Sequence, residues 1–303
     1  MGEFPHRISL REVGPRDGLQ NEDPVPTAGK VALINSLSRT GLRRIEAVSF
    51  VHPDAIPQMA DATEVWAQIE RNPEVSYSAL VPNLRGAQRA LDAGFTDVEV
   101  VISASDTHNK RNVNRSTEQS LGELPAIVEL VHAYGGRVQV IVATAWGCPY
   151  EGEVPVSRVL HVVDRALDGG ADSIAYGDTT GMATPTRVTR LVEETRSARP
   201  DLSLGLHFHN TRGTGLANVL AALQLGVDDL DASVGGLGGC PYAPGASGNI
   251  ATEELVHMLE DMGVATGVDL AALIDVAAQA ERLVGHELPS QVLRAGPRTR
   301  TAA

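Results

Sequence analysis

The stretch Leu204-Gly-Leu-His-Phe-His-Asn210 has the pattern of a buried strand that ends in polar residues. Side chains two positions apart in a strand share a face, so His207 and His209 should stand side by side at its end. Paired imidazoles in that position are typical of a divalent-metal site. One core histidine and one surface histidine would give the same pattern, so the rest of the chain has to decide between the two interpretations.

Strand-like apolar runs alternate with helical segments along the whole chain. Apolar residues recur at helical spacing within 156–167 and 216–223. Several strand-like runs are apolar throughout, for example Val138-Gln-Val-Ile-Val142, as expected of parallel strands that are covered on both faces. Eight such units favour a closed (β/α)8 barrel, a TIM barrel, over an open doubly wound sheet. The predicted strands are 8–13, 43–49, 75–81, 97–103, 137–143, 172–177, 203–208 and 229–234.

We expect a single domain over residues 1–303, because no linker-like change of composition divides the chain. The barrel should occupy about residues 7–262. A C-terminal helical extension should follow at about 269–284, and then an arginine-bearing, mobile tail at 285–303.

The bulk composition narrows the class of protein. The chain has 303 residues, 43% of them hydrophobic, which is typical of a soluble globular protein. Its formal charge of −13 argues against a general affinity for nucleic acid. No apolar run approaches the roughly 20 residues that cross a bilayer, and the first residues lack a signal-peptide pattern. Two cysteines are too few for a disulfide framework. We therefore expect a cytoplasmic protein with no membrane or nucleic-acid partner.

Polar residues follow the predicted strands at the end where (β/α)8 barrels carry their active sites. Closure makes the first, seventh and eighth strands neighbours, so Asp17, His207, His209 and Asn249 can converge on one point. Two imidazoles, a carboxylate and an amide oxygen suit Mg²⁺ or Mn²⁺. Zn²⁺ more often takes a thiolate or a third histidine and is the less favoured metal.

Simpler roles remain open for several of these polar residues. Asp17 could cap a turn, Arg16 could form a surface ion pair, and Asn249 could cap the helix that follows it. Glu46 lies inside a predicted strand, where burial is costly unless the carboxylate is paired, so it belongs either to a core network or to the active site. Asp178, in Gly-Asp-Thr-Thr-Gly, could close an Asx turn.

Cys240 lies in a glycine-rich loop at residues 235–248. The loop lacks the spacing of the known nucleotide-binding motifs, so a nucleotide site is weakly supported. Its glycines would permit a mobile lid that carries Cys240 over the metal. An inert, small apolar side chain is the alternative for this cysteine.

Four segments resemble the hydroxymethylglutaryl-CoA lyase family, which belongs to the metal-dependent aldolase barrels. The resemblance covers roughly residues 7 to 290, and the loop around Cys240 is specific to the lyase branch. The Arg16-Asp17 step and the histidine pair alone would indicate only the wider superfamily, which includes isopropylmalate and homocitrate synthases. The segments are 11–22, 45–51 with 57–59, 147–152 and 236–249.

The resemblance implies a TIM barrel, a homodimer and a set of site residues. It implies that Arg16 polarises the substrate carbonyl and that Cys240 is catalytic. Gln20 and Glu253 match positions around the metal site, and Glu46 and Asp178 match positions that support catalysis. The implied metal ligands are Asp17, His207, His209 and Asn249.

The activity that the resemblance implies is a retro-Claisen cleavage of hydroxymethylglutaryl-CoA to acetoacetate and acetyl-CoA, as in leucine degradation. The base would be His207 or Asp17, assisted by Glu46. Coenzyme A is polyanionic, so an acidic protein needs a local basic site for it. The candidates, for which a solvated charge cluster is the alternative, are Lys110, Arg111 and Arg115.

Departures from the lyase pattern leave the acyl group open. They include Asp23, Asn210 and Arg212, and a possible second polar pair, Asp106 and His108. Isohexenylglutaryl-CoA or citramalyl-CoA would fit the same chemistry. A condensing acyltransferase of the same superfamily and a non-catalytic CoA- or metal-binding protein are the remaining alternatives.

Overall fold

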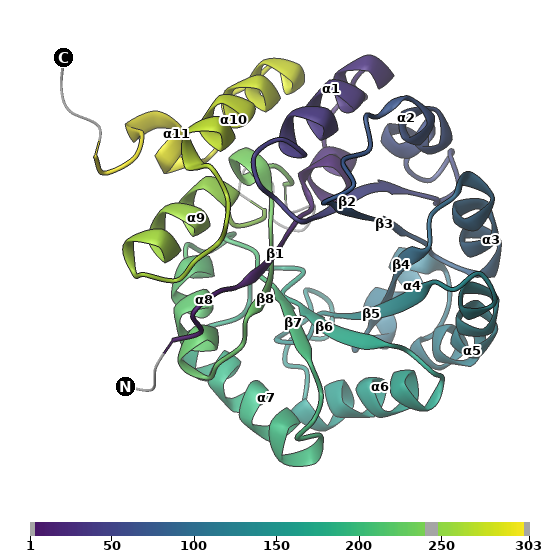
Figure 1. Ribbon diagram of the computed structural model, residues 1–303. Coiled ribbons are helices and arrows are strands. Elements are labelled where there is room, and N and C mark those ends of the chain that lie inside the picture. Colours follow the sequence, from purple (N-terminus) through teal and green to yellow (C-terminus); the bar gives the residue numbers. More distant parts are fainter. Residues whose placement is uncertain (1–3, 240–247, 300–303) are drawn as a thin grey trace.

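The structure, a computed structural model, describes residues 4–239 and 248–299. Eight parallel strands follow one another around a closed barrel, and β1 pairs with β8 to complete it (Figure 1). Helices ring the barrel on the outside, which confirms the predicted (β/α)8 fold. The strands are β1 Ser9–Glu12, β2 Arg44–Ser49, β3 Ser76–Leu80, β4 Asp97–Ser103, β5 Arg137–Ala143, β6 Ser173–Gly177, β7 Leu204–His207 and β8 Asp229–Ala232.

The strands agree with the predicted apolar runs because the barrel is covered on both faces. The valine and isoleucine side chains along β4, β5 and β6 are buried between the barrel interior and the outer helices, apart from the half-buried Val101. The longest register runs between β4 and β5, from Asp97 opposite Arg137 to Ser103 opposite Ala143.

The outer helices follow the strands in the expected alternation. The predicted segments at 156–167 and 216–223 form α6 and α8. The helices are α1 Thr27–Leu37, α2 Ala62–Gln68, α3 Leu84–Ala93, α4 Asp106–Val113, α5 Thr117–Ala133, α6 Val156–Asp168, α7 Pro185–Ala198, α8 Gly215–Gln224, α9 Thr252–Asp261, α10 Leu270–Val284 and α11 Gln291–Ala295.

The C-terminal extension packs against the start of the barrel. Helix α10 lies beside α1, as Figure 1 shows, and its buried side chains join the common core. Within the segment predicted as a mobile tail, residues 291–295 form the short helix α11, with Val292 buried. Ser290 caps this helix by accepting a hydrogen bond from the backbone N–H of Leu293. The predicted tail therefore contains a short helix that was not expected from the sequence, and its cap and buried Val292 stabilise that helix.

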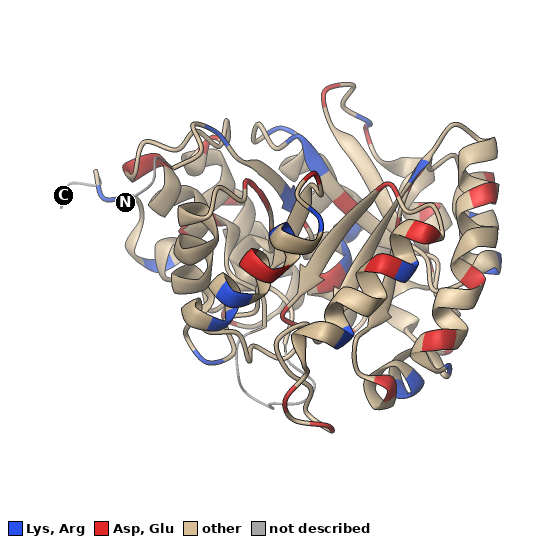
Figure 2. Cartoon of the chain, turned by 90° about the horizontal axis from the view of Figure 1, so that it is seen from below, with Lys and Arg blue, Asp and Glu red and all other residues tan. Residues whose placement is uncertain are grey.

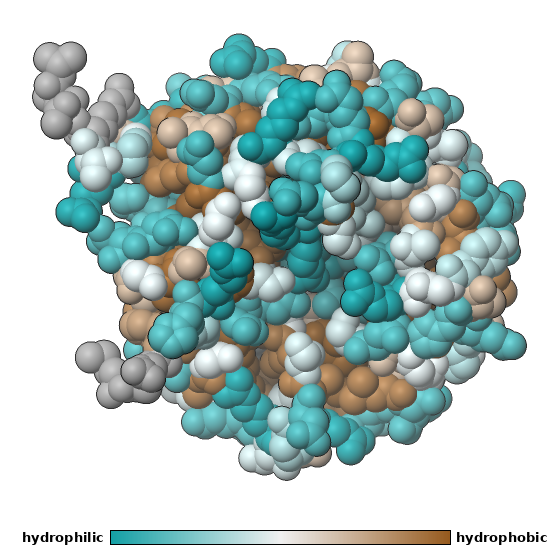
Figure 3. Space-filling view, viewed as in Figure 1, coloured by the Kyte–Doolittle hydropathy of each residue, from teal (hydrophilic) through white to brown (hydrophobic). Residues whose placement is uncertain are grey.

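The surface is polar and carries both signs of charge. Acidic and basic residues both lie along the outer helices in Figure 2. Hydrophilic residues cover most of the face drawn in Figure 3, with smaller apolar patches between them. Among the described residues, no helix combines the length and the apolar character that crossing a membrane requires.

We predict that Leu273→Ala lowers the free energy of unfolding by about 2–5 kcal/mol, because this α10 side chain is completely buried and its truncation leaves a cavity. Urea unfolding followed by circular dichroism measures the change. Asp275→Ala, on the exposed face of α10, is the control and should shift stability by less than about 0.5 kcal/mol. Unfolding of α10 alone at low urea, with the barrel midpoint unchanged, would contradict the expectation that barrel and extension form one domain.

Candidate active site

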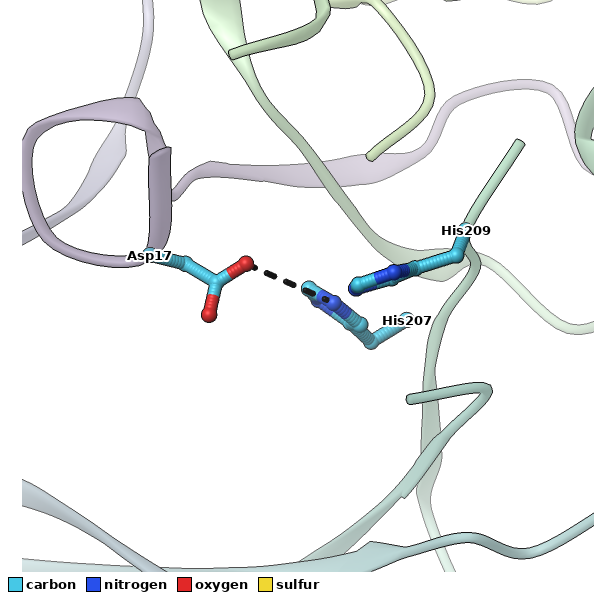
Figure 4. Close-up of side chains that lie close together, drawn as sticks. All are labelled: Asp17, His207 and His209. Carbon is cyan, nitrogen blue, oxygen red and sulfur yellow. Dashed lines mark ion pairs between the residues drawn. The ribbon is translucent and has the colours of Figure 1, made fainter. Parts of the chain in front are cut away.

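Three of the predicted metal ligands converge at the mouth of the barrel. Asp17 follows β1, His207 ends β7, and His209 lies two residues further on. All three side chains are buried, and their ligating atoms lie within 4.8 Å of one another. Figure 4 shows the carboxylate of Asp17 pointing toward the two imidazoles. The sequence-based expectation that the first and seventh strands meet at one cluster is therefore met by the geometry.

Asp17 is placed by a tight turn directly after β1. Residues Gly14–Gly18 form one π-helical turn, in which the carbonyl of Val13 accepts from the backbone N–H groups of Arg16, Asp17 and Gly18. The turn begins immediately after the strand, so the position of β1 fixes the carboxylate.

The two oxygens of Asp17 face different partners. Arg16 Nη1 at 2.7 Å and Gln20 Nε2 at 2.8 Å both donate to Oδ1. Asn249 Nδ2 donates to Oδ2 at 2.7 Å. The same Oδ2 lies 4.0 Å from Nε2 of His207, which is too far for a hydrogen bond. That gap suits two ligands that each lie about 2.1 Å from a shared cation.

Two buried polar atoms at this cluster have no hydrogen-bond partner among the described residues. They are Nδ1 of His209 and Oδ1 of Asn249, and the backbones of these two residues form a β-bridge with each other. Leaving such atoms unsatisfied costs free energy, and a bound cation would remove that cost. Gly238 makes room here, because a Cβ at its φ of 105° would lie 2.7 Å from Asn249 Nδ2. The donor set therefore fits a divalent metal.

The electrostatics of the cluster also suit a cation. Burial favours the neutral form of Asp17, but Arg16 and the two imidazoles outweigh it and hold the pKa of Asp17 at about 2. Burial and the neighbouring His207 lower the pKa of His209 to about 4, which leaves its imidazole neutral. Burial also lowers the pKa of His207, but its contact with Asp231 and the charge of Asp17 produce a net rise.

Arg16 joins the cluster to Glu46. Its Nη2 lies 2.7 Å from Oε2 of Glu46, whose side chain is completely buried in β2. The Nε of Arg16 has no hydrogen-bond partner among the described residues, although the residue lines the cavity. Glu46 is thus part of a buried ion pair, and that ion pair belongs to the site.

A cavity of about 810 Å³ opens onto the cluster, a volume within the usual range for a small-molecule site. Apolar side chains line it on the β3–β5 side, including Leu80, Val101 and Ile141. His108 lines it as well, and burial lowers the pKa of its imidazole to about 4. Asp106, the suggested partner of His108, does not line the cavity. It accepts from the Thr117 backbone and pairs with Lys110 instead.

The three predicted CoA-binding residues differ in position. Arg111 and Arg115 line the cavity, whereas Lys110 does not and instead pairs with Asp106 at 2.6 Å. The guanidinium of Arg111 lies 4.3 Å from the ring centroid of Tyr150. Arg115 forms an ion pair with Glu123. The basic site facing the cavity therefore consists of two arginines.

Local contacts decide between the turn or cap roles that the sequence left open for Asp178 and Asn249. Asp178 accepts from the backbone N–H groups of Met182 at 2.8 Å and Ala183 at 3.0 Å, as a loop-closing aspartate does. Burial raises the pKa of Asp178 to about 6. Asn249 does not cap the following helix, because α9 begins at Thr252 and its cap position is Ala251.

Two buried carboxylates hold the turn that leads into the glycine-rich loop. Glu253 accepts from the backbone N–H of Gly235 at 2.8 Å. Glu12 accepts from the backbone N–H of Val234 at 2.8 Å and from the hydroxyl of Thr252 at 2.6 Å. Glu253 thus fixes the backbone at Gly235, whereas Cys240 lies outside the described residues.

A charged cluster beside the predicted metal ligands was not expected from the sequence. Arg11, Glu99 and Asp231 are all buried inside the barrel, one each on β1, β4 and β8. A signal was present, because each is a charged residue inside a predicted barrel strand, where burial demands a partner. Which residue pairs with which depends on barrel register, and local sequence does not contain that information.

Comparison with known proteins identifies the family. The HMGL-like family model matches residues 7–279. A hydroxymethylglutaryl-CoA lyase of Bacillus subtilis is 45% identical over 292 residues, which cover 96% of this chain and 98% of that protein. The chain belongs to the HMGL-like family.

Solved structures agree with this assignment to the HMGL-like family. The crystal structure of the B. subtilis HMG-CoA lyase has a TM-score of 0.95 at 44% identity and covers 97% of this chain and 99% of its own. An HMG-CoA lyase of Acinetobacter baumannii, in complex with coenzyme A and 3-methylmalate, has a TM-score of 0.94 at 46% identity. That match covers 100% of this chain and 99% of the other.

We predict a pH-dependent contribution of Glu253 to stability. Burial raises the pKa of Glu253 to about 8 and that of Glu12 to about 7, while an unfolded glutamate has a pKa near ~4.3. Between these values the folded state binds more protons, so the free energy of unfolding falls as pH rises, by at most about 1.4 kcal/mol per pH unit for each carboxyl.

Glu253→Gln removes one such carboxyl, so its free energy of unfolding should fall less than that of the wild type between about pH 5 and pH 8. Urea titrations at a series of pH values measure the two slopes. Glu129→Gln, on the exposed face of α5, is the matched control. Parallel slopes for wild type and Glu253→Gln would show that burial does not hold this proton.

Proposed function

We propose that this protein is a metal-dependent carbon–carbon lyase that cleaves 3-hydroxy-3-methylglutaryl-CoA to acetoacetate and acetyl-CoA. One observation carries the proposal: Asp17, His207 and His209 form a ligand cluster beside Arg16 in the cavity of an HMGL-like barrel. The relatives that match nearly the whole chain are named hydroxymethylglutaryl-CoA lyases. From the family resemblance we also propose a cytoplasmic homodimer that acts in leucine degradation.

The residues that would hold the metal are Asp17, His207, His209 and Asn249, and we propose Mg²⁺ or Mn²⁺ because no thiolate is among them. The metal would supply Lewis acidity, which lowers the pKa of the substrate's tertiary hydroxyl. The proton of that hydroxyl passes to Asp17, whose Oδ2 faces the gap toward Nε2 of His207. His207, the alternative base, would have no free lone pair with Nε2 on the metal and a proton on Nδ1. Glu46 assists through Arg16, which its carboxylate holds in place.

Arg16 stabilises the negative charge that develops on the thioester oxygen as the carbon–carbon bond breaks. Its two terminal nitrogens are already fixed by Asp17 and Glu46, so the guanidinium is oriented before substrate binds. Nε supplies a buried donor that has no protein partner among the described residues. A prealigned cation of this kind lowers the barrier more than it strengthens ground-state binding.

Two further roles complete the scheme. We propose Cys240 as the general acid that protonates the enolate carbon of acetyl-CoA, a step that requires its thiol form. We propose Arg111 and Arg115 as contacts for the phosphates of coenzyme A, because both line the cavity of a strongly acidic protein. Coenzyme A in the complex of the A. baumannii lyase supports a thioester substrate. Asp178 supports the site by holding the loop after β6.

We predict that purified protein releases acetyl-CoA from hydroxymethylglutaryl-CoA when Mg²⁺ or Mn²⁺ is present and loses this activity after dialysis against a strong chelator. A coupled assay for acetyl-CoA measures the rate. Isohexenylglutaryl-CoA and citramalyl-CoA are tested in parallel, and the highest kcat/KM identifies the acyl group. Acetoacetate with acetyl-CoA, incubated without hydroxymethylglutaryl-CoA, tests for a condensing enzyme. Full activity in the chelated protein would exclude the metal-dependent scheme.

We predict that Asp17→Ala and His207→Ala each reduce turnover by several orders of magnitude and also weaken Mn²⁺ binding, because each removes a proposed ligand that also borders the reacting groups. Isothermal titration with Mn²⁺ measures binding independently of turnover. His161→Ala is the matched control, since this imidazole lies on the outer helix α6 and pairs with Glu118. Unchanged Mn²⁺ affinity in both site variants would show that neither Asp17 nor His207 is a metal ligand.

A further inference from the structure

The guanidinium of Arg11 is completely enclosed at the centre of the barrel. The residue is 2% exposed, and four of its five N–H donors are used by two buried carboxylates and a half-buried glutamine. Nε and Nη2 donate to the two carboxylate oxygens of Asp231 at 2.9 and 2.8 Å. Nη1 donates to Glu99 at 2.5 Å and to Gln139 at 2.7 Å. Strands β1, β4, β5 and β8 are thus tied together by one side chain.

Asp231 connects this clamp to a proposed metal ligand. Its Oδ2, which already accepts from Arg11, lies 3.2 Å from Nδ1 of His207. The backbones of His207 and Asp231 are register partners on β7 and β8. For Nε2 of His207 to offer a lone pair to a metal, the ring proton must sit on Nδ1, where Asp231 is the acceptor.

Arg11 restricts the orientation of Asp231 in a way that a single contact would not. Two parallel N–H donors hold both carboxylate oxygens, so the plane of the carboxylate is set by the planar fork. The position of Oδ2 then sets the position of the imidazole above it. A lysine in place of Arg11 would keep the positive charge but lose the fork.

We propose that Arg11 is a positioning residue for the metal centre, because its guanidinium fork fixes Asp231, and Asp231 in turn fixes the imidazole of His207. The inference rests on the metal centre of the proposed function and adds a residue that touches neither metal nor substrate. Contacts that orient a ligating histidine change metal affinity by about 10- to 100-fold when they are removed. Loss of the fork should act through metal affinity rather than through the chemistry itself.

The chain contains a matched control in the same barrel. Arg44 on β2 is the register partner of Arg11 and pairs with Asp229, which lies two residues before Asp231 on β8. This second arginine–aspartate pair contacts Ser9 and has no contact with His207 in the hydrogen bonds of the described residues. Arg44→Lys therefore perturbs a similar ion pair without affecting the orientation of the metal ligand.

The experiment measures Mn²⁺ binding to metal-free wild type, Arg11→Lys and Arg44→Lys, using electron paramagnetic resonance to count free Mn²⁺. We expect Arg11→Lys to raise the Kd by about 10- to 100-fold and Arg44→Lys to change it by less than about twofold. In steady-state assays, Arg11→Lys should need more Mn²⁺ for half-maximal activity and regain most of its kcat at saturating Mn²⁺. A merely structural role would lower the thermal midpoint without shifting this Mn²⁺ requirement.

A second variant, Asp231→Asn, tests the same chain of contacts in case Arg11→Lys folds poorly. Asp231→Asn keeps the size of the side chain but replaces one acceptor oxygen with an amide, so it should also weaken Mn²⁺ binding by at least about tenfold. Wild-type protein that binds no Mn²⁺ would defeat the proposed function itself. If the wild type binds Mn²⁺ and the Kd values of Arg11→Lys and Asp231→Asn equal the wild-type Kd, only the positioning role of Arg11 is overturned. The same holds if Arg44→Lys weakens Mn²⁺ binding as much as Arg11→Lys does.

Discussion

The pairing of β1 with β8 is the constraint on which the site depends. Four consecutive register pairs, from Ser9 opposite Asp229 to Glu12 opposite Ala232, close the barrel. This closure brings the turn that carries Asp17 close to the strand end that carries His207, although 190 residues separate the two in the sequence. An open sheet with the same strands would leave β1 and β8 at separate edges, and no ligand cluster would form.

The predicted metal ligands Asp17 and His207 are held by rigid backbone rather than by long loops. Asp17 lies in a turn that begins one residue after β1, and His207 is itself the last residue of β7. Glu12 also stabilises the turn that carries Asp17, because its carboxylate accepts from the backbone N–H groups of both Gly14 and Val234. Preorganisation of this kind keeps a ligand set within the small tolerance that metal binding requires.

The sequence predicted the fold and the convergence of Asp17 with the two histidines, because hydrophobic periodicity and the position of polar residues after strands are local signals. It did not predict that Asn249 donates to Asp17 instead of capping α9, or that residues 291–295 form a helix. It also did not predict the contacts of Arg11. Side-chain partners across a barrel depend on strand register and packing, which a one-dimensional pattern does not specify.

The buried ions inside the barrel cost stability, and the need for Asp231 beside His207 explains why the barrel keeps them. A well-packed apolar layer in place of Arg11, Glu99 and Asp231 could be equally stable or more so, since desolvation of buried ions offsets much of their attraction. Burial favours the neutral form of Glu99 and raises its pKa despite the neighbouring Arg11, so desolvation outweighs the attraction between these two groups. Asp231 alone would leave a buried, uncompensated charge beneath His207. The network is therefore best understood as the requirement for a fixed carboxylate at that depth, which only a buried cation can make tolerable.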